Sequence, residues 1–227
     1  MLVYVDDIVL TSSNPRLLKD FIARLSNEIA MKDLGDLHYF LGIEFHHTPQ
    51  ELFLSQSKYA LDILEQASTV DCKPISTPMV MGQHLSGNGS PYVDLTHFRS
   101  IVGALQYLAI TRPDLTHSVN TMCLFMLAPT KEHYLAIKRI LCYIKGSLHF
   151  GLTIYSNSEQ RSLAYSDTDW ASCPDTRRST SIFAVFLGCN LISSNAKKQS
   201  TVSHSSTKSE YRSPSITVVE LVRICTL

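Results

Sequence analysis

The sequence lacks a C-x-x-C pair, a long apolar run and an excess of charge of one sign. Its six cysteines are scattered along the chain, so we expect free thiols in a reducing compartment, packed as small buried hydrophobic side chains rather than used as metal ligands. No apolar run approaches the ~20 residues of a membrane helix, and the first residues lack the basic segment of a signal peptide. We therefore expect an intracellular protein, cytoplasmic or nuclear, that is neither secreted nor membrane-bound.

Charge is balanced overall but uneven along the chain. The net charge is +0, so it neither favours nor excludes a polyanionic partner. Residues 1–57 carry 4 Lys/Arg against 8 Asp/Glu, whereas residues 176–213 carry six basic side chains and one acidic side chain, Glu210. The basic residues are Arg177, Arg178, Lys197, Lys198, Lys208 and Arg212. They are candidates for contact with a phosphate backbone, and a merely solvated basic face remains the alternative.

Hydrophobic periodicity divides the chain into segments of alternating type. With 44% hydrophobic residues the 227-residue chain can bury a core of one or two domains. Period-two stretches predict strands, and 3.6-residue periodicity predicts helices. Strands are predicted at 2–5, 8–11, 37–45, 51–56, 148–155, 161–167, 180–188 and 190–194. Helices are predicted from Pro15 to about 29, at 57–67, 98–108, 115–126 and 134–144, and from Ser206 onward. Asn14 is the predicted N-cap of the first helix, and Thr130 is predicted to cap the helix that contains 134–144.

The other segments carry turn and loop signals. Residues 71–93 contain Pro74, Pro78 and Pro91 and are expected to form an irregular surface linker outside the core. No internal repeat or low-complexity segment is present. The whole pattern indicates an α+β fold.

Two adjacent carboxylates, Asp6 and Asp7, interrupt the apolar stretch MLVYVDDIVL. A tight hairpin turn can bring both to one end of a strand pair. Mg²⁺ takes carboxylate and phosphate oxygens, so such a pair is a plausible platform for two-metal phosphoryl transfer. A solvated Asp-Asp turn is the alternative, and spacing alone favours it.

The residues around this pair resemble the catalytic YxDD hairpin of reverse transcriptases. The resemblance continues along the chain and points to the copia-type retrotransposon Pol polyprotein. The matching blocks are MKDLGDLHYFLGIEF (31–45), ISTPM (75–79), FRSIVGALQYLAITRPDL (98–115), YSDTDWASCPDTRRSTS (165–181) and LISSNAKKQSTVSHSSTKSEYRS (191–213). It implies that residues 1–57 end the polymerase palm, 58–150 form thumb and connecting helices, and 151–227 begin an RNase H domain with an incomplete mixed sheet and one helix.

The resemblance also assigns roles to individual residues. Asp6 and Asp7 would hold Mg²⁺ for DNA synthesis on an RNA template from a DNA primer. Asp167 and Glu210 would be Mg²⁺ ligands for cutting RNA in an RNA–DNA hybrid, and Asp169 is a neighbour rather than a ligand. The first turn of a helix favours a carboxylate such as Glu210. The hybrid would then lie against Arg177, Arg178, Lys197 and Lys198.

Each predicted metal site has only part of the family's set of acidic residues. The family's first polymerase Asp lies upstream of YxDD, and two further RNase H acids follow the helix of Glu210. Without them a bound cation is under-coordinated, so we expect an inactive remnant of the enzyme. A non-catalytic module that binds RNA–DNA hybrids is the alternative, and an enzyme completed in trans by another chain is a third hypothesis.

Three further expectations concern the last segment. Pro214 should strain the helix of Glu210 by ~3 kcal/mol, since it lacks an N–H and clashes with the carbonyl four residues earlier. The incomplete sheet should leave an open edge prone to self-association, so that the isolated chain is marginally stable. Trp170 is expected to be a buried aromatic beside its strand rather than a nucleic-acid contact.

Overall fold

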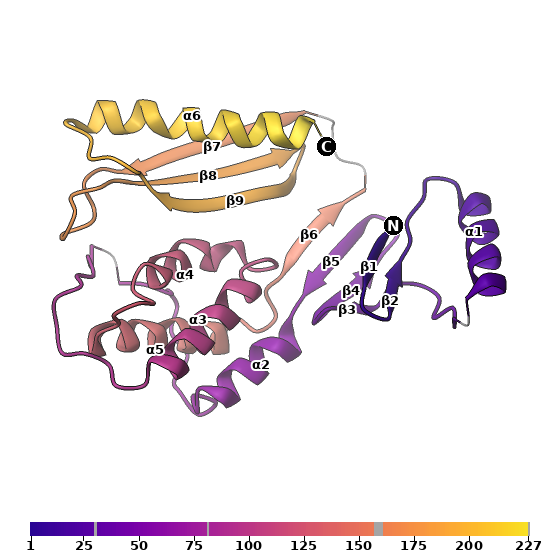
Figure 1. Cartoon of the computed structure of the whole chain (residues 1–227), viewed down its shortest axis with the longest axis horizontal. Helices are drawn as coiled ribbons and strands as arrows, with labels where there is room; N and C mark the ends of the chain where they lie inside the picture. Colours follow the sequence, from indigo (N-terminus) through magenta and orange to yellow (C-terminus); the bar gives the residue numbers. More distant parts are fainter. Residues whose placement is uncertain (30, 81, 157–160, 227) are drawn as a thin grey trace. The chain divides into compact units, whose positions relative to one another are not determined.

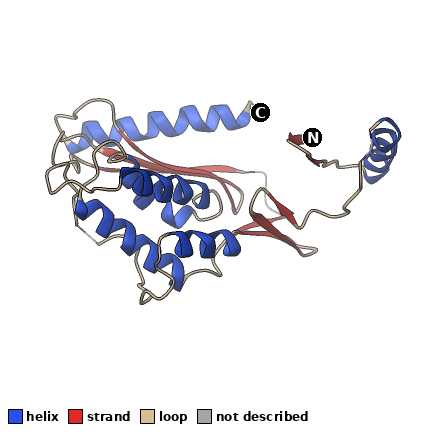
Figure 2. Cartoon of the chain, turned by 60° about the horizontal axis from the view of Figure 1, so that its bottom comes forward, coloured by secondary structure: helices blue, strands red, loops and turns tan. Residues whose placement is uncertain are grey.

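The computed structural model describes residues 1–29, 31–80, 82–156 and 161–226 (Figure 1). The chain divides into two compact units, Met1–Leu41 and Gly42–Leu227. Both units contain helices and strands (Figure 2), and the predicted α+β class is confirmed. Over the described ranges, no helix combines the length and the apolarity needed to cross a membrane.

The first unit contains a hairpin, a helix and a short strand. Strands β1 (Leu2–Tyr4) and β2 (Asp7–Val9) pair antiparallel. Helix α1 (Pro15–Glu28) begins as predicted, because the Asn14 side chain accepts a hydrogen bond from the N–H of Arg16 and Pro15 occupies the first turn. None of the residues of α1 is buried. The unit ends with β3 (Tyr39–Phe40) and Leu41.

The predicted strand over residues 37–45 is interrupted. Leu41 and Gly42 have φ angles of 49° and 77°, which are incompatible with extended backbone, so only residues 39–40 and 43–47 form strands. A leucine in this left-handed region is uncommon, whereas a glycine adopts it at no steric cost. The sequence periodicity did not reveal this turn.

A second sheet joins segments about a hundred residues apart in the chain. Strands β4 (Ile43–His47), β5 (Glu51–Ser55) and β6 (Leu152–Tyr155) pair antiparallel, with Leu54 opposite Leu152. Gly151 makes the approach possible, because a Cβ there would lie 2.3 Å from the Leu54 carbonyl oxygen. β6 therefore pairs with β5, although the resemblance assigned it to the last domain.

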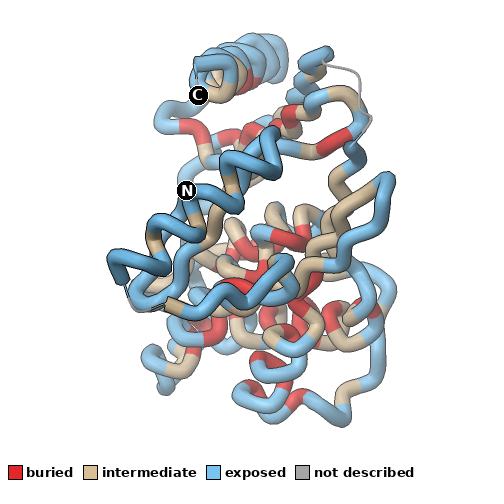
Figure 3. The backbone as a smooth tube through the Cα atoms, turned by 90° about the vertical axis from the view of Figure 1, so that its right-hand side faces the viewer, coloured by how far each residue is buried: buried red, intermediate tan, exposed pale blue. Residues whose placement is uncertain are grey.

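The hydrophobic core lies among the helices of the second unit. These are α2 (Ser57–Gln66), α3 (Leu95–Leu108), the 3₁₀ turn η1 (Pro113–Leu115), α4 (Thr116–Cys123) and α5 (Lys131–Gly146). Phe98, Ile101, Met122, Ile137 and Ile140 are fully buried. Figure 3 draws buried residues in red along the backbone. The apolar stripes predicted as core are confirmed.

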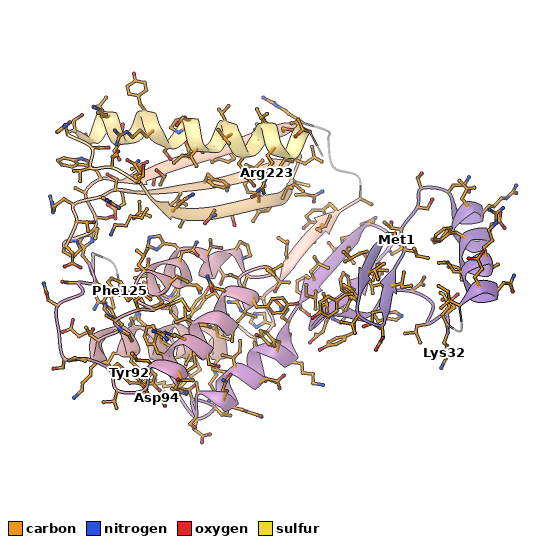
Figure 4. The ribbon with its side chains drawn as sticks, viewed as in Figure 1. Met1, Lys32, Tyr92, Asp94, Phe125 and Arg223 are labelled. Carbon is orange, nitrogen blue, oxygen red and sulfur yellow. The ribbon has the colours of Figure 1, made fainter. Side chains whose placement is uncertain are left out.

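Helix ends in this layer follow local hydrogen bonding. α4 ends earlier than predicted, because the N–H groups of Leu124 and Phe125 bond to carbonyls three residues back. α5 is capped by Thr130 as predicted, and its His133 ring nitrogen accepts the Thr130 N–H in return, at 2.9 Å. Asp94, which is labelled in Figure 4, precedes α3. It caps the helix by accepting the N–H of His97 at 2.8 Å.

The linker between α2 and α3 contains no described helix or strand, as predicted. Its expected place outside the core is wrong for Leu85, which is buried in the helical core. Near the end of the linker the Tyr92 ring stacks on Tyr134 with centroids 4.4 Å apart. An irregular segment can thus contribute to a core when single apolar side chains reach it.

The last segment forms three strands and a long helix. Strands β7 (Ser162–Asp169), β8 (Thr180–Leu187) and β9 (Asn190–Lys198) are antiparallel neighbours in that order. This corrects the expectation of a mixed sheet for this part of the chain. Helix α6 (Ser206–Cys225) contacts β7 and β8 and continues through Pro214. Near the proline, the Ser215 hydroxyl donates to the Arg212 carbonyl oxygen at 2.7 Å.

Candidate functional site

The Asp6-Asp7 pair lies at a two-residue turn. Tyr4 pairs with Asp7, so the turn is formed by Val5 and Asp6, and the predicted meeting point of the strands shifts by one residue. Val5 has a φ of 49°, the sign that primed hairpin turns require at their first central residue. A β-branched residue there is strained, and such strain is concentrated at functional sites.

Both carboxylates of the turn are exposed to solvent. Asp6 lies at the turn and Asp7 is the first residue of β2. They offer the oxygen donors that Mg²⁺ prefers, and a bound ion would take its other ligands from water or phosphate oxygens. In the part of the chain that the structure describes, no group of three or more His, Cys, Asp or Glu residues could hold a metal ion. The two carboxylates of the pair could therefore supply part of the ligands of a bound cation.

Asp167 and Glu210 lie on elements that touch. Asp167 is in β7, and its side chain accepts the N–H of Thr168 at 2.8 Å. Glu210 is exposed in α6 and lies in its second turn, so the expected place in the first turn is wrong. Ser213, one turn further along, donates its hydroxyl to the Asp167 carbonyl oxygen at 2.9 Å. The fold thus brings the backbone of β7 to the helix turn that carries Glu210.

The sheet register separates these two carboxylates. Asp167 pairs with Ile182, and directly opposite side chains share a face of the sheet. The neighbouring Ser181 lies on the other face, where Gln199 bridges it to Ser209 of α6 with bonds of 2.9 and 3.1 Å. The Asp167 side chain therefore starts on the face that α6 does not cover. A shared ligand role with Glu210 stays a prediction.

The four predicted nucleic-acid contacts gather at one end of the same sheet. Arg177 and Arg178 belong to the connection before β8, and Lys197 and Lys198 end β9. Thr180, the first residue of β8, pairs with Lys198. Adjacent side chains on a strand point to opposite faces, so Lys197 and Lys198 do not extend one flat surface. Their contact with nucleic acid stays a prediction.

Lys198 has a partner that sequence reasoning missed. Its ammonium donates to the Cys173 sulfur at 2.8 Å. Burial raises the pKa of Cys173, but hydrogen bonds from Lys198 and Thr176 outweigh it and lower the pKa to about 7. Part of the basic charge at this end of the sheet is thus used within the protein.

Asp175 ties the β7–β8 connection to the linker before α3. Its carboxylate accepts the Ser86 hydroxyl and, at 2.7 Å, the N–H of Gly87. The Ser86 hydrogen bond, followed by the Gly87 N–H, lowers the pKa of Asp175. No sequence signal pointed to this contact, because Asp175 lies 89 positions after Ser86 and 88 after Gly87 in the chain.

Two expectations about burial are wrong. Trp170 is 47% exposed, with its indole N–H donating to the Ser203 carbonyl oxygen at 3.3 Å. The six cysteines are free as predicted, but none of them is buried, and Cys189 and Cys225 are exposed. Cys123 in α4 packs against the core but is only partly buried.

Comparison with known proteins places these features in a family. The sequence model described as "Reverse transcriptase (RNA-dependent DNA polymerase)" matches residues 1–81. The chain is 51% identical over 221 residues to "Uncharacterized mitochondrial protein AtMg00810" of Arabidopsis thaliana, covering 97% of this chain and 92% of that protein. No solved structure matches the chain.

Two further relatives are transposon polyproteins. The chain is 45% identical over 228 residues to "Retrovirus-related Pol polyprotein from transposon RE1" of Arabidopsis thaliana, covering 100% of this chain and 16% of that protein. It is 32% identical over 232 residues to the corresponding polyprotein from transposon TNT 1-94 of Nicotiana tabacum, covering 98% of this chain and 17% of the relative. The chain thus spans about a sixth of the length of these polyproteins. It belongs to the copia-type retrotransposon Pol polyprotein family, with its reverse transcriptase match in residues 1–81.

Proposed function

We propose that this chain carries the catalytic hairpin of an RNA-directed DNA polymerase and is inactive as an isolated polypeptide. One observation supports the first part most directly. The YVDD sequence forms a two-residue hairpin turn with a strained valine at its first central position and two exposed carboxylates. A rigid hairpin is a suitable support for a metal-binding pair, because the supporting backbone fixes where the ligands point.

The proposed allocation of segments follows the family. The palm would end near residue 57, the helices of 58–150 would form the thumb and connection, and β7–β9 with α6 would begin an RNase H-like domain. Strand β6 joins these parts, since it pairs with β5 and its Tyr155 backbone is bonded by the Asn190 side chain of β9. The two bonds to Asn190 measure 2.7 and 3.0 Å. The Asn190 side-chain amide thus satisfies the N–H and the carbonyl oxygen of Tyr155, as a neighbouring strand would.

Inactivity is argued from the number of ligands. When bound, Mg²⁺ would orient phosphate oxygens and offset their charge. Asp6 and Asp7 would hold it, and Asp167 and Glu210 would have the same role in hybrid cleavage. A two-metal site needs more carboxylates than one pair supplies, and the described residues bring no third ligand to either pair. The intact polyprotein's DNA synthesis and hybrid cleavage thus depend on acids beyond these two pairs.

Primer extension tests this proposal. The full chain is incubated with Mg²⁺, deoxynucleotides and a DNA primer on an RNA template, alongside Asp6→Asn and an Asp20→Asn control in α1. We expect no product from any of the three proteins. If the unmodified chain and Asp20→Asn both extend the primer and Asp6→Asn does not, the catalytic role of the hairpin is confirmed and inactivity is refuted. The same assay with added upstream palm segment should restore synthesis, and failure to restore it would refute the catalytic assignment.

A non-catalytic hybrid-binding role is the second candidate. It is favoured by the four basic side chains at one end of the β7–β9 sheet. Binding of an RNA–DNA duplex, measured by fluorescence anisotropy, should weaken as salt rises, because each neutralised phosphate releases counterions. Replacing Lys197 by Glu should reduce the slope of log K against log salt by about 1 or more, whereas Lys131→Glu in α5 should leave it unchanged. Binding that is indifferent to salt would exclude this role.

A further inference from the structure

Two cysteines from distant parts of the second unit meet beside α5. Cys72 lies in the linker after α2, and Cys142 lies in the fourth turn of α5. Their thiol groups are within hydrogen-bonding reach of one another. Both residues are partly exposed, so a small oxidant can reach them.

The backbone around the two thiols is held in place by contacts on both sides. The N–H of Ile75 donates to the Cys142 carbonyl oxygen at 3.3 Å. Pro74 lies so close to Gly146 that a Cβ there would be 3.1 Å from the proline ring. One turn earlier in α5, Arg139 donates to the Thr77 hydroxyl at 2.7 Å. The linker segment 72–77 therefore runs along α5, and the thiol contact is part of a longer packed interface.

We propose that Cys72 and Cys142 form an intramolecular disulfide when the protein meets a peroxide. A disulfide has an S–S bond of ~2.05 Å, so the two sulfurs must move closer together to form it. The contacts of Pro74, Ile75 and Thr77 with α5 keep the segment that follows Cys72 beside Cys142 and favour this approach. The bond would pin the linker segment 72–77 to α5 and cross-link residues 70 positions apart in the chain (142 − 72). It is independent of the metal-binding pairs and of any contact with nucleic acid.

The chemistry balances in two steps. The Cys72 thiolate attacks one oxygen of hydrogen peroxide, an S–O bond forms, the O–O bond breaks and hydroxide leaves, giving a sulfenic acid. The Cys142 thiolate then attacks that sulfur, the S–S bond forms and the S–O bond breaks, releasing a second hydroxide. With the two thiol protons the products are one disulfide and two water molecules, and peroxide is the species reduced.

The environment of Cys142 sets the conditions for closure. Burial, followed by the hydrogen bond that the Cys142 thiol donates to Cys72, raises the pKa of Cys142 to about 11. Only the thiolate attacks a sulfenic acid, so mildly alkaline solution favours closure. Cys173, with its lower pKa, is expected to react with peroxide sooner, and a Cys173→Ser background removes this competing thiol.

Peptide mapping of the oxidised full chain tests the proposal. Dilute Cys173→Ser protein is treated with hydrogen peroxide at pH 8.5, remaining thiols are alkylated, and tryptic peptides are identified by mass. We expect two thiols to be lost and a dithiothreitol-sensitive peptide pair joining Cys72 to Cys142. Adding Cys142→Ser should abolish the pair, whereas adding Cys123→Ser should retain it.

The opposite results are equally clear. Retention of all thiols, a disulfide between any other two cysteines, or a bond between two chains would overturn the proposal. If the Cys142→Ser protein does not fold, mapping of the background protein alone still decides, because the cross-linked peptide either contains both residues or does not. The circular dichroism spectrum of each variant serves as the check on its folding.

Discussion

Replacing Arg112 should cost this protein a large part of its stability. Arg112 is the largest fully buried side chain, only 2% exposed, although it carries a full charge. It donates to both carboxylate oxygens of Asp114 at 2.9 and 2.7 Å, and to the carbonyl and hydroxyl oxygens of Ser147 at 2.9 and 2.8 Å. Its guanidinium also lies 5.7 Å from the Tyr143 ring centroid and 5.3 Å from that of Phe150.

The magnitude follows from what remains after the guanidinium is removed. Breaking a buried ion pair by deleting one partner costs about 3–5 kcal/mol, chiefly because the other charge stays unpaired. Asp114 is 32% exposed and also accepts the Tyr143 hydroxyl at 2.9 Å, so water and the phenol compensate in part. We therefore expect Arg112→Met to cost about 3 kcal/mol, or about 6–12 °C in Tm at this chain length.

Urea unfolding followed by circular dichroism measures this effect. Arg112→Lys should also destabilise, because an ammonium cannot reproduce the planar fork of donors. In the double variant Arg112→Met with Asp114→Asn, no charge is stranded, so its loss should be smaller than the sum of the two single losses. The matched control is Arg161→Met, which removes an exposed guanidinium and should change stability by less than about 0.5 kcal/mol.

Two results would refute the reasoning. A loss below about 1 kcal/mol for Arg112→Met would mean that the buried charge is dispensable. Strict additivity in the double variant would mean that Arg112 and Asp114 do not depend on one another.

Other positions give further tests by the same unfolding assay. Gly151→Ala should destabilise the protein by about 1–3 kcal/mol, since its Cβ would overlap the Leu54 carbonyl oxygen. The control Gly103→Ala in α3 places its Cβ in open space and should stabilise the protein by about 0.5–1 kcal/mol. Equal effects of the two substitutions would contradict the close approach of β5 and β6. Burial lowers the pKa of His133, whose ring nitrogen accepts a hydrogen bond from the N–H of Thr130. Because the folded pKa lies below the unfolded value near 6.5, stability should be full above pH 6.5 and fall as the pH drops below it, and a His133→Gln variant that keeps the same pH dependence would contradict this.

Local sequence signals determined much of the secondary structure. Asn14 with Pro15, and Thr130 before α5, predicted helix starts because capping depends on side chains within a few residues of the backbone groups they satisfy. The apolar stripe containing Phe98 and Ile101 likewise predicted a buried helix face. The motif around Asp6 and Asp7, together with the matching blocks along the chain, pointed to the family, because such motifs are defined by the order of residues alone.

Only the tertiary structure decided how distant segments meet. The pairing of β6 with β5, the face of β7 that carries Asp167, and the burial of Arg112 depend on packing between residues far apart in sequence. The same holds for the contact of Cys72 with Cys142. Periodicity states which side of an element is apolar, but the partner that covers that side is chosen by the free energy of the whole packed arrangement, to which every segment contributes.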